Sequence, residues 1–261
     1  MTPRPFPLRA GIMEVVRVHD VGPSLRRLTF RDDGLRHLDC EHPGEILTLG
    51  WAPPGQPLVL PTEGWRFAPE PPPEQHWRNY TVRRHDAEAG EVDVDVVLHG
   101  DEGRFSAWAR RARPGATLGY AGPRIDWAPL ADARWQLLFG DETALPVIAA
   151  VLEGLPAGTR ALAVVEVEGP ADELALASPA DLDVRWLHRG RPPGAPTGHL
   201  AEAVAALVRP DGPGQAWGAG ESLAVRDARR DLQARLGRDR VKVTGYWRHR
   251  DTPDDVASIE T

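Results

Sequence analysis

Three short stretches of the sequence carry side chains whose types and spacing suit a phosphorylated, aromatic ligand. The first is "RNYTVRRHD" at residues 78–86, which places an Arg, a Tyr and a Thr close together. Arg78 can pair with a phosphate, Tyr80 can stack on a ring, and Thr81 can hydrogen-bond a ring heteroatom. The same residues also suit an ordinary solvated strand, so this stretch does not decide the matter alone.

The other two stretches are turns that lead from an apolar strand into a helix. In "FGDETALP", Gly140 allows close approach of a ligand, and Asp141 or Thr143 can cap the helix that follows. In "WGAGES", the small residues Ala219 and Gly220 leave room for the flat edge of a ligand. Ligands of open α/β sheets bind outside the carboxyl ends of the strands. Plain helix capping explains the first stretch better than a ligand does, and a tight turn explains the second equally well.

The stretch at 78–86 lies in a part of the chain that the hydrophobic pattern predicts to be β-structure. Six short apolar runs fall between residue 12 and about residue 120, and "VDVDVVL" alternates as a half-buried strand does. They predict a small antiparallel barrel or sandwich. The Pro-rich stretch 52–76 predicts a long surface loop without regular structure, and "GRFSAWARRARPG" predicts a short helix ended by Pro-Gly.

From about residue 135 the pattern changes to strands that alternate with helices. This alternation predicts a parallel sheet that is covered on both faces. We therefore expect two domains, 1–126 and 127–250, followed by a flexible acidic tail at 251–261. The fold class is two-domain β plus α/β.

Composition excludes several classes of function. The net charge of -7 argues against a nucleic-acid partner. The single Cys excludes an intrachain disulfide and a multi-Cys metal site, which is consistent with a reducing cytoplasm. No signal peptide and no run of membrane-spanning length is present, so we expect a soluble cytoplasmic protein without membrane insertion. The His residues form no metal-ligand motif, and hydrolase and P-loop motifs are missing.

Seven motifs in order resemble the siderophore-interacting proteins, which are flavin-dependent ferric-siderophore reductases related to the ferredoxin-NADP reductase superfamily. The motifs are "RNYTVRR", "VDVDVVLHGDEG", "AWARRARPGATLGYAGPR", "FGDETALPVIAAVLEGLP", "WLHRG", "AWGAGES" and "VTGYWRHR". The resemblance covers about residues 12 to 250. It implies a six-stranded FAD-binding barrel followed by a nicotinamide-binding α/β domain, with NADPH or NADH as electron donor.

The resemblance also implies where the cofactors bind. The first motif would hold the flavin and its phosphates, and the second would line the diphosphate and adenine. The fourth would open the nicotinamide domain, the sixth would lie beside the nicotinamide, and the seventh matches the Y-W-R end of the family. The implied cofactor-binding set is Arg78, Tyr80, Thr81, Val97, His99, Gly103, Ser106, Ala107, Asp141, Thr143, Ala144, Ala219, Gly220, Glu221 and Trp247. Candidates for an anionic ferric chelate are Arg83 and Arg248, although both also suit a plain charged surface.

Two positions depart from the family pattern. Arg104 and Phe105 stand where members usually have Pro-Ala, so that Phe105 can crowd the adenine or stack on it, and Arg104 can add a phosphate contact. Thr48 stands where a Lys is common, in a region thought to dock anionic ferric siderophores. For a 2'-phosphate of NADPH, Arg185 and Arg189 are both plausible ligands.

The leading hypothesis is therefore a ferric-siderophore reductase in which electrons pass from NAD(P)H through FAD to a ferric chelate. No residue needs to act as an acid or base, and no metal site is expected. A ferredoxin donor stays an alternative to the nicotinamide. Two other functions stay open, namely a biosynthetic flavoenzyme with an organic substrate and a non-catalytic ligand-binding homologue.

Overall fold

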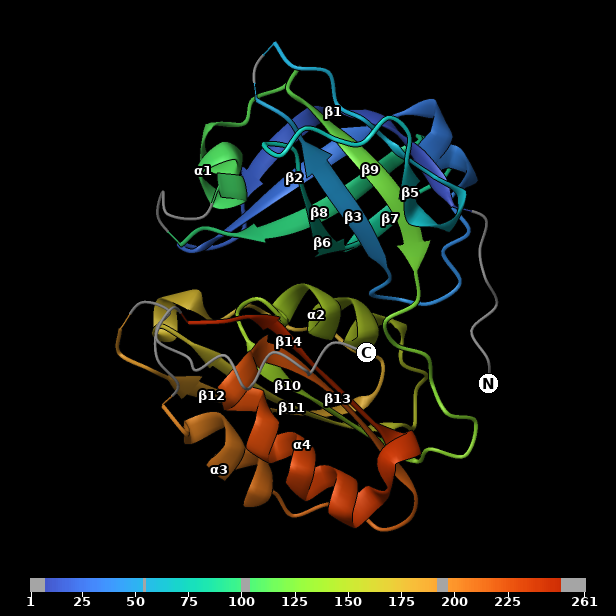
Figure 1. Ribbon diagram of the computed structural model, residues 1–261. Coiled ribbons are helices and arrows are strands. Elements are labelled where there is room, and N and C mark those ends of the chain that lie inside the picture. Colours follow the sequence, from blue (N-terminus) through green and yellow to red (C-terminus); the bar gives the residue numbers. More distant parts are fainter. Residues whose placement is uncertain (1–7, 54, 100–103, 192–196, 250–261) are drawn as a thin grey trace. The chain divides into compact units, whose positions relative to one another are not determined.

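The computed structural model describes residues 8–53, 55–99, 104–191 and 197–249 of the 261-residue chain (Figure 1). The chain forms two compact units, Met1–Asp126 and Trp127–Thr261. The first unit has one apolar core, and the second has one on each face of its sheet. Gly103 and the predicted flexible tail lie outside the described residues.

The first unit is built on an antiparallel sheet, as the sequence predicts. The strands follow the order β6-β3-β9-β1-β2-β8-β7, and every neighbouring pair is antiparallel. Their bounds are β1 (Arg9–Asp20), β2 (Leu25–Arg31), β3 (Ile46–Trp51), β6 (His76–Thr81), β7 (Arg84–Asp86), β8 (Glu91–Val97) and β9 (Thr117–Arg124). Seven strands thus stand where the sequence predicts six.

The additional strand arises because the predicted strand at 78–86 is divided into β6 and β7. β6 pairs with β3, whereas β7 pairs with β8 at the other edge of the sheet. Between them, Val82 N donates to Glu45 O over 2.7 Å, and Arg83 N donates to Asp93 O over 2.9 Å. One continuous stretch therefore supplies both edges, and the sheet curls until its edges meet there.

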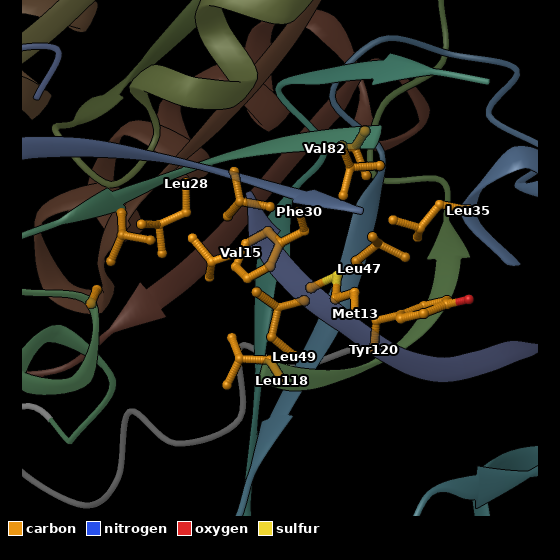
Figure 2. Packing of buried hydrophobic residues seen from close by; sticks show 14 of the residues in the cluster. Met13, Val15, Leu28, Phe30, Leu35, Leu47, Leu49, Val82, Leu118 and Tyr120 are labelled. Atoms are coloured by element: carbon orange, nitrogen blue, oxygen red, sulfur yellow. The ribbon is translucent and has the colours of Figure 1, made fainter. Parts of the chain in front are cut away.

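Apolar side chains inside this curl form the core of the first unit. Figure 2 shows the packing around Phe30, which is fully buried. Every second residue of β8, namely Val92, Val94 and Val96, belongs to the core. The alternation in "VDVDVVL" therefore identifies this strand and its buried face correctly.

The acidic residues of β8 are also buried, on the face opposite the valines. Arg27 Nε and Nη2 donate to the two carboxylate oxygens of Asp95 over 2.7 and 2.8 Å. Arg84 Nε donates to Asp93 over 2.8 Å, and Arg31 forms an ion pair with Glu91. Buried charges need such partners, so the outer face of β8 is a layer of arginine–carboxylate pairs.

The Pro-rich stretch 52–76 contains more regular structure than the sequence predicts. Within it, β4 (Pro61–Thr62) and β5 (Arg66–Phe67) form a two-stranded antiparallel ladder. The side chain of Gln75 accepts from Val59 N over 2.8 Å and donates to Val59 O over 2.7 Å. The Gln75 amide group thus makes the two hydrogen bonds to Val59 that a neighbouring strand would make. These bonds hold the backbone of the Pro-rich stretch at this residue.

The first unit has one described α-helix, α1 (Arg104–Arg111), where the sequence predicts it. Two 3-10 turns, Asp33–His37 and Glu63–Trp65, are also present among its described residues. α1 follows β8 in the chain, so the strand that carries the buried carboxylates leads directly into the region of the predicted dinucleotide contacts.

The second unit has a five-stranded parallel sheet with the order β12-β11-β10-β13-β14. Its strands are β10 (Trp135–Asp141), β11 (Arg160–Val167), β12 (Asp181–His188), β13 (Gly214–Glu221) and β14 (Val241–Trp247). Its helices are α2 (Leu145–Gly154), α3 (His199–Ala205) and α4 (Ser222–Leu236), with 3-10 turns at Pro170–Asp172 and Arg238–Arg240. The predicted alternation of strands and helices is confirmed.

The helices cover both faces of this sheet. α2 packs on one face, and α3 and α4 pack on the other (Figure 1). Leu138 of β10 belongs to the core under α2, whereas Leu137 and Phe139 belong to the core under α3 and α4. β10 is consequently buried along its whole length, and polar side chains of the unit gather at the carboxyl ends of the strands.

Candidate functional site

In the first unit, β6 carries the predicted flavin-binding residues, and the structure gives each a different exposure. Arg78 is exposed, Tyr80 is half-buried, and Thr81 is buried. Arg78 and Tyr80 are two residues apart on the strand, so their side chains leave the sheet on the same face. Arg78 Nη1 donates to Trp77 O over 2.8 Å. The rest of its guanidinium can reach an anion.

Tyr80 is fixed from behind by an aromatic cluster in which Phe105 is central. The Phe105 ring centroid lies 4.4 Å from that of Tyr80, 5.2 Å from that of Trp51 and 5.4 Å from that of Trp108. Phe105 is 4% exposed and belongs to the core. This large residue therefore supports Tyr80 rather than projecting outward, and burial raises the pKa of the Tyr80 hydroxyl.

A second group of predicted residues lies where β8 leads into α1. His99 N donates to the buried Ser106 Oγ over 3.1 Å, which ties the end of the strand to the first turn of the helix. The His99 side chain is exposed, and Val97 and Ala107 are half-buried. Ser106 thus holds the strand end in place, and an exposed imidazole lies beside it.

These residues fit a flavin dinucleotide. An exposed guanidinium suits a diphosphate, and a half-buried tyrosine ring with a rigid backing suits an aromatic ring system. The first turn of α1 offers backbone N–H groups of the kind that bind phosphate at helix N-termini. The residues could hold the group, and Phe105 lies in the core beneath them.

Arg83, a predicted ligand of the ferric chelate, lies beside a buried carboxylate. Its side chain is 14% exposed and its Nε is 3.9 Å from Asp95 Oδ2, which also accepts from Arg27. Most of the Arg83 charge is therefore directed at a buried carboxylate. Thr48, which stands where a lysine is common, is buried, and its hydroxyl donates to Asn79 Oδ1 over 2.8 Å.

In the second unit, the two predicted strand-to-helix turns lie side by side. β10 and β13 are neighbours, and Gly140 is the register partner of Ala219. The strand order reverses between these two strands, since β11 and β12 lie beyond β10 while β14 lies beyond β13. Such a reversal is where open α/β sheets bind ligands. The structure therefore brings both turns to one edge of the sheet.

Asp141 is the centre of this edge. Its Oδ1 accepts from Thr143 N over 2.9 Å and from Thr143 Oγ1 over 2.5 Å. Its Oδ2 accepts from Glu221 N over 2.9 Å and from Trp247 Nε1 over 2.8 Å. Asp141 is 6% exposed, so one buried carboxylate joins the ends of β10, β13 and β14 to the start of α2.

Gly220 is required for this close approach. Its φ of +153° lies in a region that favours glycine, and a Cβ there would lie 2.8 Å from Asp141 Oδ2. The next residue, Glu221, caps α4, since its Oε2 accepts from Leu223 N and Ala224 N over 2.7 and 3.0 Å. The predicted "AGE" turn therefore has a local structural explanation in addition to its predicted contact with a cofactor.

The pKa of Asp141 is raised above that of an ordinary aspartate. Burial and the neighbouring Glu142 carboxylate raise its pKa from 3.8 to about 6, against the hydrogen bonds from Thr143 and Trp247. A carboxyl group whose pKa is higher in the folded state stabilises the fold below its unfolded pKa, and this contribution is lost as the pH rises through the folded pKa. Asp141 therefore favours the folded state most in acid.

We predict that the wild-type protein gains up to about 3 kcal/mol of unfolding free energy relative to Asp141→Asn as the pH falls from about 7 to about 4. The asparagine does not titrate, so the difference between the two proteins isolates this group from all other carboxyl groups. Denaturant unfolding at several pH values measures it. Parallel stability curves for the two proteins would contradict the raised pKa.

Glu142 is paired with Arg189, an interaction that the sequence does not reveal. Arg189 Nη1 and Nη2 donate to the two carboxylate oxygens of Glu142 over 2.8 and 2.6 Å. The two side chains are 7% and 6% exposed. The negative charge at the start of α2 is thus neutralised, while the Arg189 guanidinium is engaged inside the unit. Ala144, another predicted contact, is also fully buried.

Gly140 permits the close packing of β10 against β13. A Cβ at this position would overlap the carbonyl oxygen of Ala219 and the Cβ of Ala144, both fixed in the core. We predict that Gly140→Ala destabilises the second unit by about 1–3 kcal/mol, as measured by denaturant unfolding. Gly169→Ala is the control, because nothing lies within 4 Å of its Cβ position. Equal stability of the two variants would refute the proposed steric conflict.

The end of β14 completes this edge of the sheet. Trp247 and Arg248 are both half-buried. Ser222, which the sequence analysis did not single out, donates through Oγ to Trp247 O over 3.0 Å. His249 N donates to Glu221 Oε1 over 3.3 Å. A serine directly after the "AGE" turn was the available signal, but its partner lies 25 residues away in sequence.

No group of three or more His, Cys, Asp or Glu side chains in the part of the chain that the structure describes could hold a metal ion. No helix among the described residues is long and apolar enough to cross a membrane.

The combination of an antiparallel barrel unit and a parallel α/β unit defines a known class of fold. The ferredoxin reductase of carbazole 1,9a-dioxygenase aligns with a TM-score of 0.65 and 17% identity, over 93% of this chain and 70% of that one. This likeness is one of fold. It places the chain in the ferredoxin-reductase-like class of two-domain folds.

Closer similarities narrow the class. The ferric vibriobactin reductase ViuB of Vibrio cholerae is 33% identical over 91% of this chain and 89% of its own length. The crystal structure of a siderophore utilization protein from T. fusca aligns with a TM-score of 0.86 and 34% identity over 97% of each chain. Models of the siderophore-interacting FAD-binding domain and the siderophore-interacting protein match residues 14–127 and 133–250. The chain belongs to the siderophore-interacting protein family.

Two further relatives differ in coverage. The NADPH-dependent ferric-chelate reductase of Escherichia coli is 28% identical over 92% of this chain and 93% of its own length. An uncharacterized protein of Mycobacterium tuberculosis is 38% identical over 66% of this chain. The aligned part spans only 64% of that mycobacterial protein's length. The resemblance inferred from the seven motifs is confirmed.

Proposed function

We propose that this protein is a flavin-dependent ferric-siderophore reductase that uses FAD as its cofactor and NADPH as its electron donor. Membership of the family and its FAD-binding domain support the cofactor. Two full-length relatives whose names state ferric vibriobactin and NADPH-dependent ferric-chelate reduction support the reaction. Their alignments cover about nine-tenths of this chain, so that both units are included.

The observation that carries the proposal is that Arg78 and Tyr80 lie two residues apart on β6 and therefore on the same face of the sheet. The exposed guanidinium would bind the FAD diphosphate, and the Tyr80 ring, backed by Phe105, would stack against the flavin. Thr81, Val97, His99, Gly103, Ser106 and Ala107 complete the proposed FAD site. Because Ser106 already holds the end of β8 in place, part of this site is preorganised.

In the second unit, the edge at Asp141 would bind the nicotinamide nucleotide. Thr143 and Ala144 directly precede α2, and Ala219, Gly220 and Glu221 end β13. Since Ala144 and Glu221 are buried, they would shape the floor of the site, and the half-buried Trp247 would present its ring to the nucleotide. An exposed Arg185 is a better candidate for a 2'-phosphate than Arg189, which is engaged by Glu142.

Bound FAD supplies hydride acceptance from NADPH followed by single-electron donation, so one NADPH reduces two ferric chelates. The residues of this chain have binding and orienting roles in that scheme. The rigid support of Tyr80 and Trp247 fixes the positions of the rings, which is the contribution that proximity makes to the rate. Proton transfer to or from a side chain is not required for reduction of the metal.

The substrate would be an anionic ferric chelate, and Arg248 is the stronger of the two candidates for its binding. Arg83 is largely buried against Asp95, whereas Arg248 is half-buried at the end of β14. Thr48 is uncharged at a position where family members often have lysine. Binding of the ferric chelate would therefore depend on fewer positively charged side chains. A ferredoxin donor and a cytoplasmic location remain expectations of the sequence, the latter supported by the single Cys.

The test is an anaerobic absorption spectrum of the purified protein after FAD loading and desalting, followed by additions of NADPH and of a ferric siderophore. We expect the oxidised flavin band to be retained, to bleach with NADPH, and to return with the ferric chelate. Retention without bleaching by NADPH or NADH would favour a ferredoxin donor or a binding protein. Bleaching that no ferric chelate reverses would favour an organic substrate.

A further inference from the structure

Three hydrogen bonds among those that hold the strand end at 247–249 link it to neighbouring side chains of the second unit. The indole Nε1 of Trp247 donates to Asp141, its carbonyl accepts from Ser222, and His249 N donates to Glu221. Of these, the bond to Asp141 is the one that fixes the ring itself. The orientation of the Trp247 side chain thus depends on a single buried carboxylate.

The groups around Asp141 differ in what they do when this carboxylate takes up a proton. Two backbone N–H groups and the Trp247 indole N–H are donors only. The fourth partner is the hydroxyl of Thr143, which can donate or accept. A proton on Oδ1 would therefore be donated to Thr143 Oγ1, and Oδ2 would continue to accept from Trp247 and Glu221.

We propose that Asp141 is a positioning residue for the Trp247 ring, and that the Thr143 hydroxyl keeps it effective in both protonation states. The proposal rests on the proposed function, in which Trp247 lines the nicotinamide site. In this role Asp141, which is 6% exposed, acts through Trp247. The Thr143 hydroxyl is the one among these four donors that can also accept a hydrogen bond.

The charged groups around Asp141 influence whether its carboxyl group is protonated. Glu142 adjoins it in sequence, Glu166 is its register partner on β11, and Glu221 is the last residue of β13. Arg189 neutralises Glu142, and Glu221 is stabilised by the first turn of α4. Burial and Glu142 raise the pKa of Asp141 to about 6, so both states occur in mildly acidic solution.

Four variants separate the roles. Thr143→Ser keeps the hydroxyl and is the matched control for Thr143→Val, which removes it with little change in volume. In Thr143→Val a protonated Asp141 has no acceptor for its proton at Oδ1, so the carboxyl group must turn away and release the indole. Asp141→Ala removes the attachment at every pH. Trp247→Phe serves only to assign the Trp247 resonance among the nine tryptophans.

The experiment is NMR of the full chain with 15N-labelled tryptophan, in which each indole N–H gives a separate signal. We expect the Trp247 signal of the wild type and of Thr143→Ser to keep its hydrogen-bonded position between about pH 8 and pH 5. In Thr143→Val it should move toward the free-indole position as the pH falls, and in Asp141→Ala it should be there throughout. A wild-type signal that moves with pH as in Thr143→Val, or an unchanged signal in Asp141→Ala, would overturn the proposal.

Steady-state kinetics supply the second arm. We expect Asp141→Ala to lower kcat/KM for NADPH by up to about 100-fold, and Thr143→Val to lose activity relative to Thr143→Ser only toward acid pH. An indole that is released without any kinetic change would refute the positioning role while leaving the reductase function intact. Failure of the wild type to oxidise NADPH would instead refute the proposed function, and the NMR signals would still decide whether Asp141 fixes the ring.

Discussion

Replacement of Arg189 by Met is expected to lower the free energy of unfolding of the second unit by about 3–5 kcal/mol. Met has a similar length, but it leaves the Glu142 carboxylate buried and without its two hydrogen bonds from Arg189. A buried charge that loses its partner costs more than the pair contributes when intact. Denaturant unfolding followed by circular dichroism would measure the loss.

Two further variants make this result specific. Arg226→Met removes an arginine of α4 whose ion pair with Asp227 is exposed, so a change within about 0.5 kcal/mol is expected. The double variant Glu142→Leu with Arg189→Met removes both buried charges and should recover most of the stability. If Arg189→Met is as stable as Arg226→Met, the buried pair does not stabilise this unit.

Arg78→Ala is expected to weaken FAD binding by about 10- to 100-fold, which corresponds to the loss of roughly 1.5–3 kcal/mol from charged hydrogen bonds. Because Arg78 is exposed and donates within the unit to the carbonyl of its neighbour Trp77, the fold should keep its stability. Titration of FAD-depleted protein with FAD, followed by flavin fluorescence, gives the dissociation constant.

The control for this variant is Arg36→Ala, which removes the same charge from an exposed site on the same unit. Arg78→Lys tests whether the planar guanidinium is needed or only its charge, since lysine cannot bind a phosphate through two parallel bonds. An Arg78→Ala protein that binds FAD as tightly as the Arg36→Ala protein would remove Arg78 from the proposed site.

Local patterns predicted much of the fold because they depend on neighbours in sequence. The alternation of β8 and the strand-helix order after residue 135 are of this kind. The division of the strand at 78–86 was not predictable, because it depends on Glu45 and Asp93, which approach it from other parts of the chain. The bonds between Gln75 and Val59 in the Pro-rich stretch were missed for the same reason, since the two residues are 16 apart in sequence.

The sequence predicted which residues form the candidate site. It did not predict the partners that determine the charge and the position of each side chain. Two adjacent carboxylates, Asp141 and Glu142, precede α2, and Arg189, 47 residues away from Glu142, pairs with it. Phe105 left two alternatives open at the sequence level, and its position in the core under Tyr80 depends on Trp51 and Trp108. Such pairings over long distances in sequence leave no periodic signal.

The stretch from β6 to β7 supplies both edges of the curled sheet and also carries Arg78, Tyr80 and Thr81. The proposed flavin contacts therefore lie on the seam that closes the barrel. A ligand that binds only the closed form stabilises it in proportion to the logarithm of its concentration. FAD binding would then stabilise the closed form of the barrel. Closure of the barrel and occupancy of the FAD site would be thermodynamically linked.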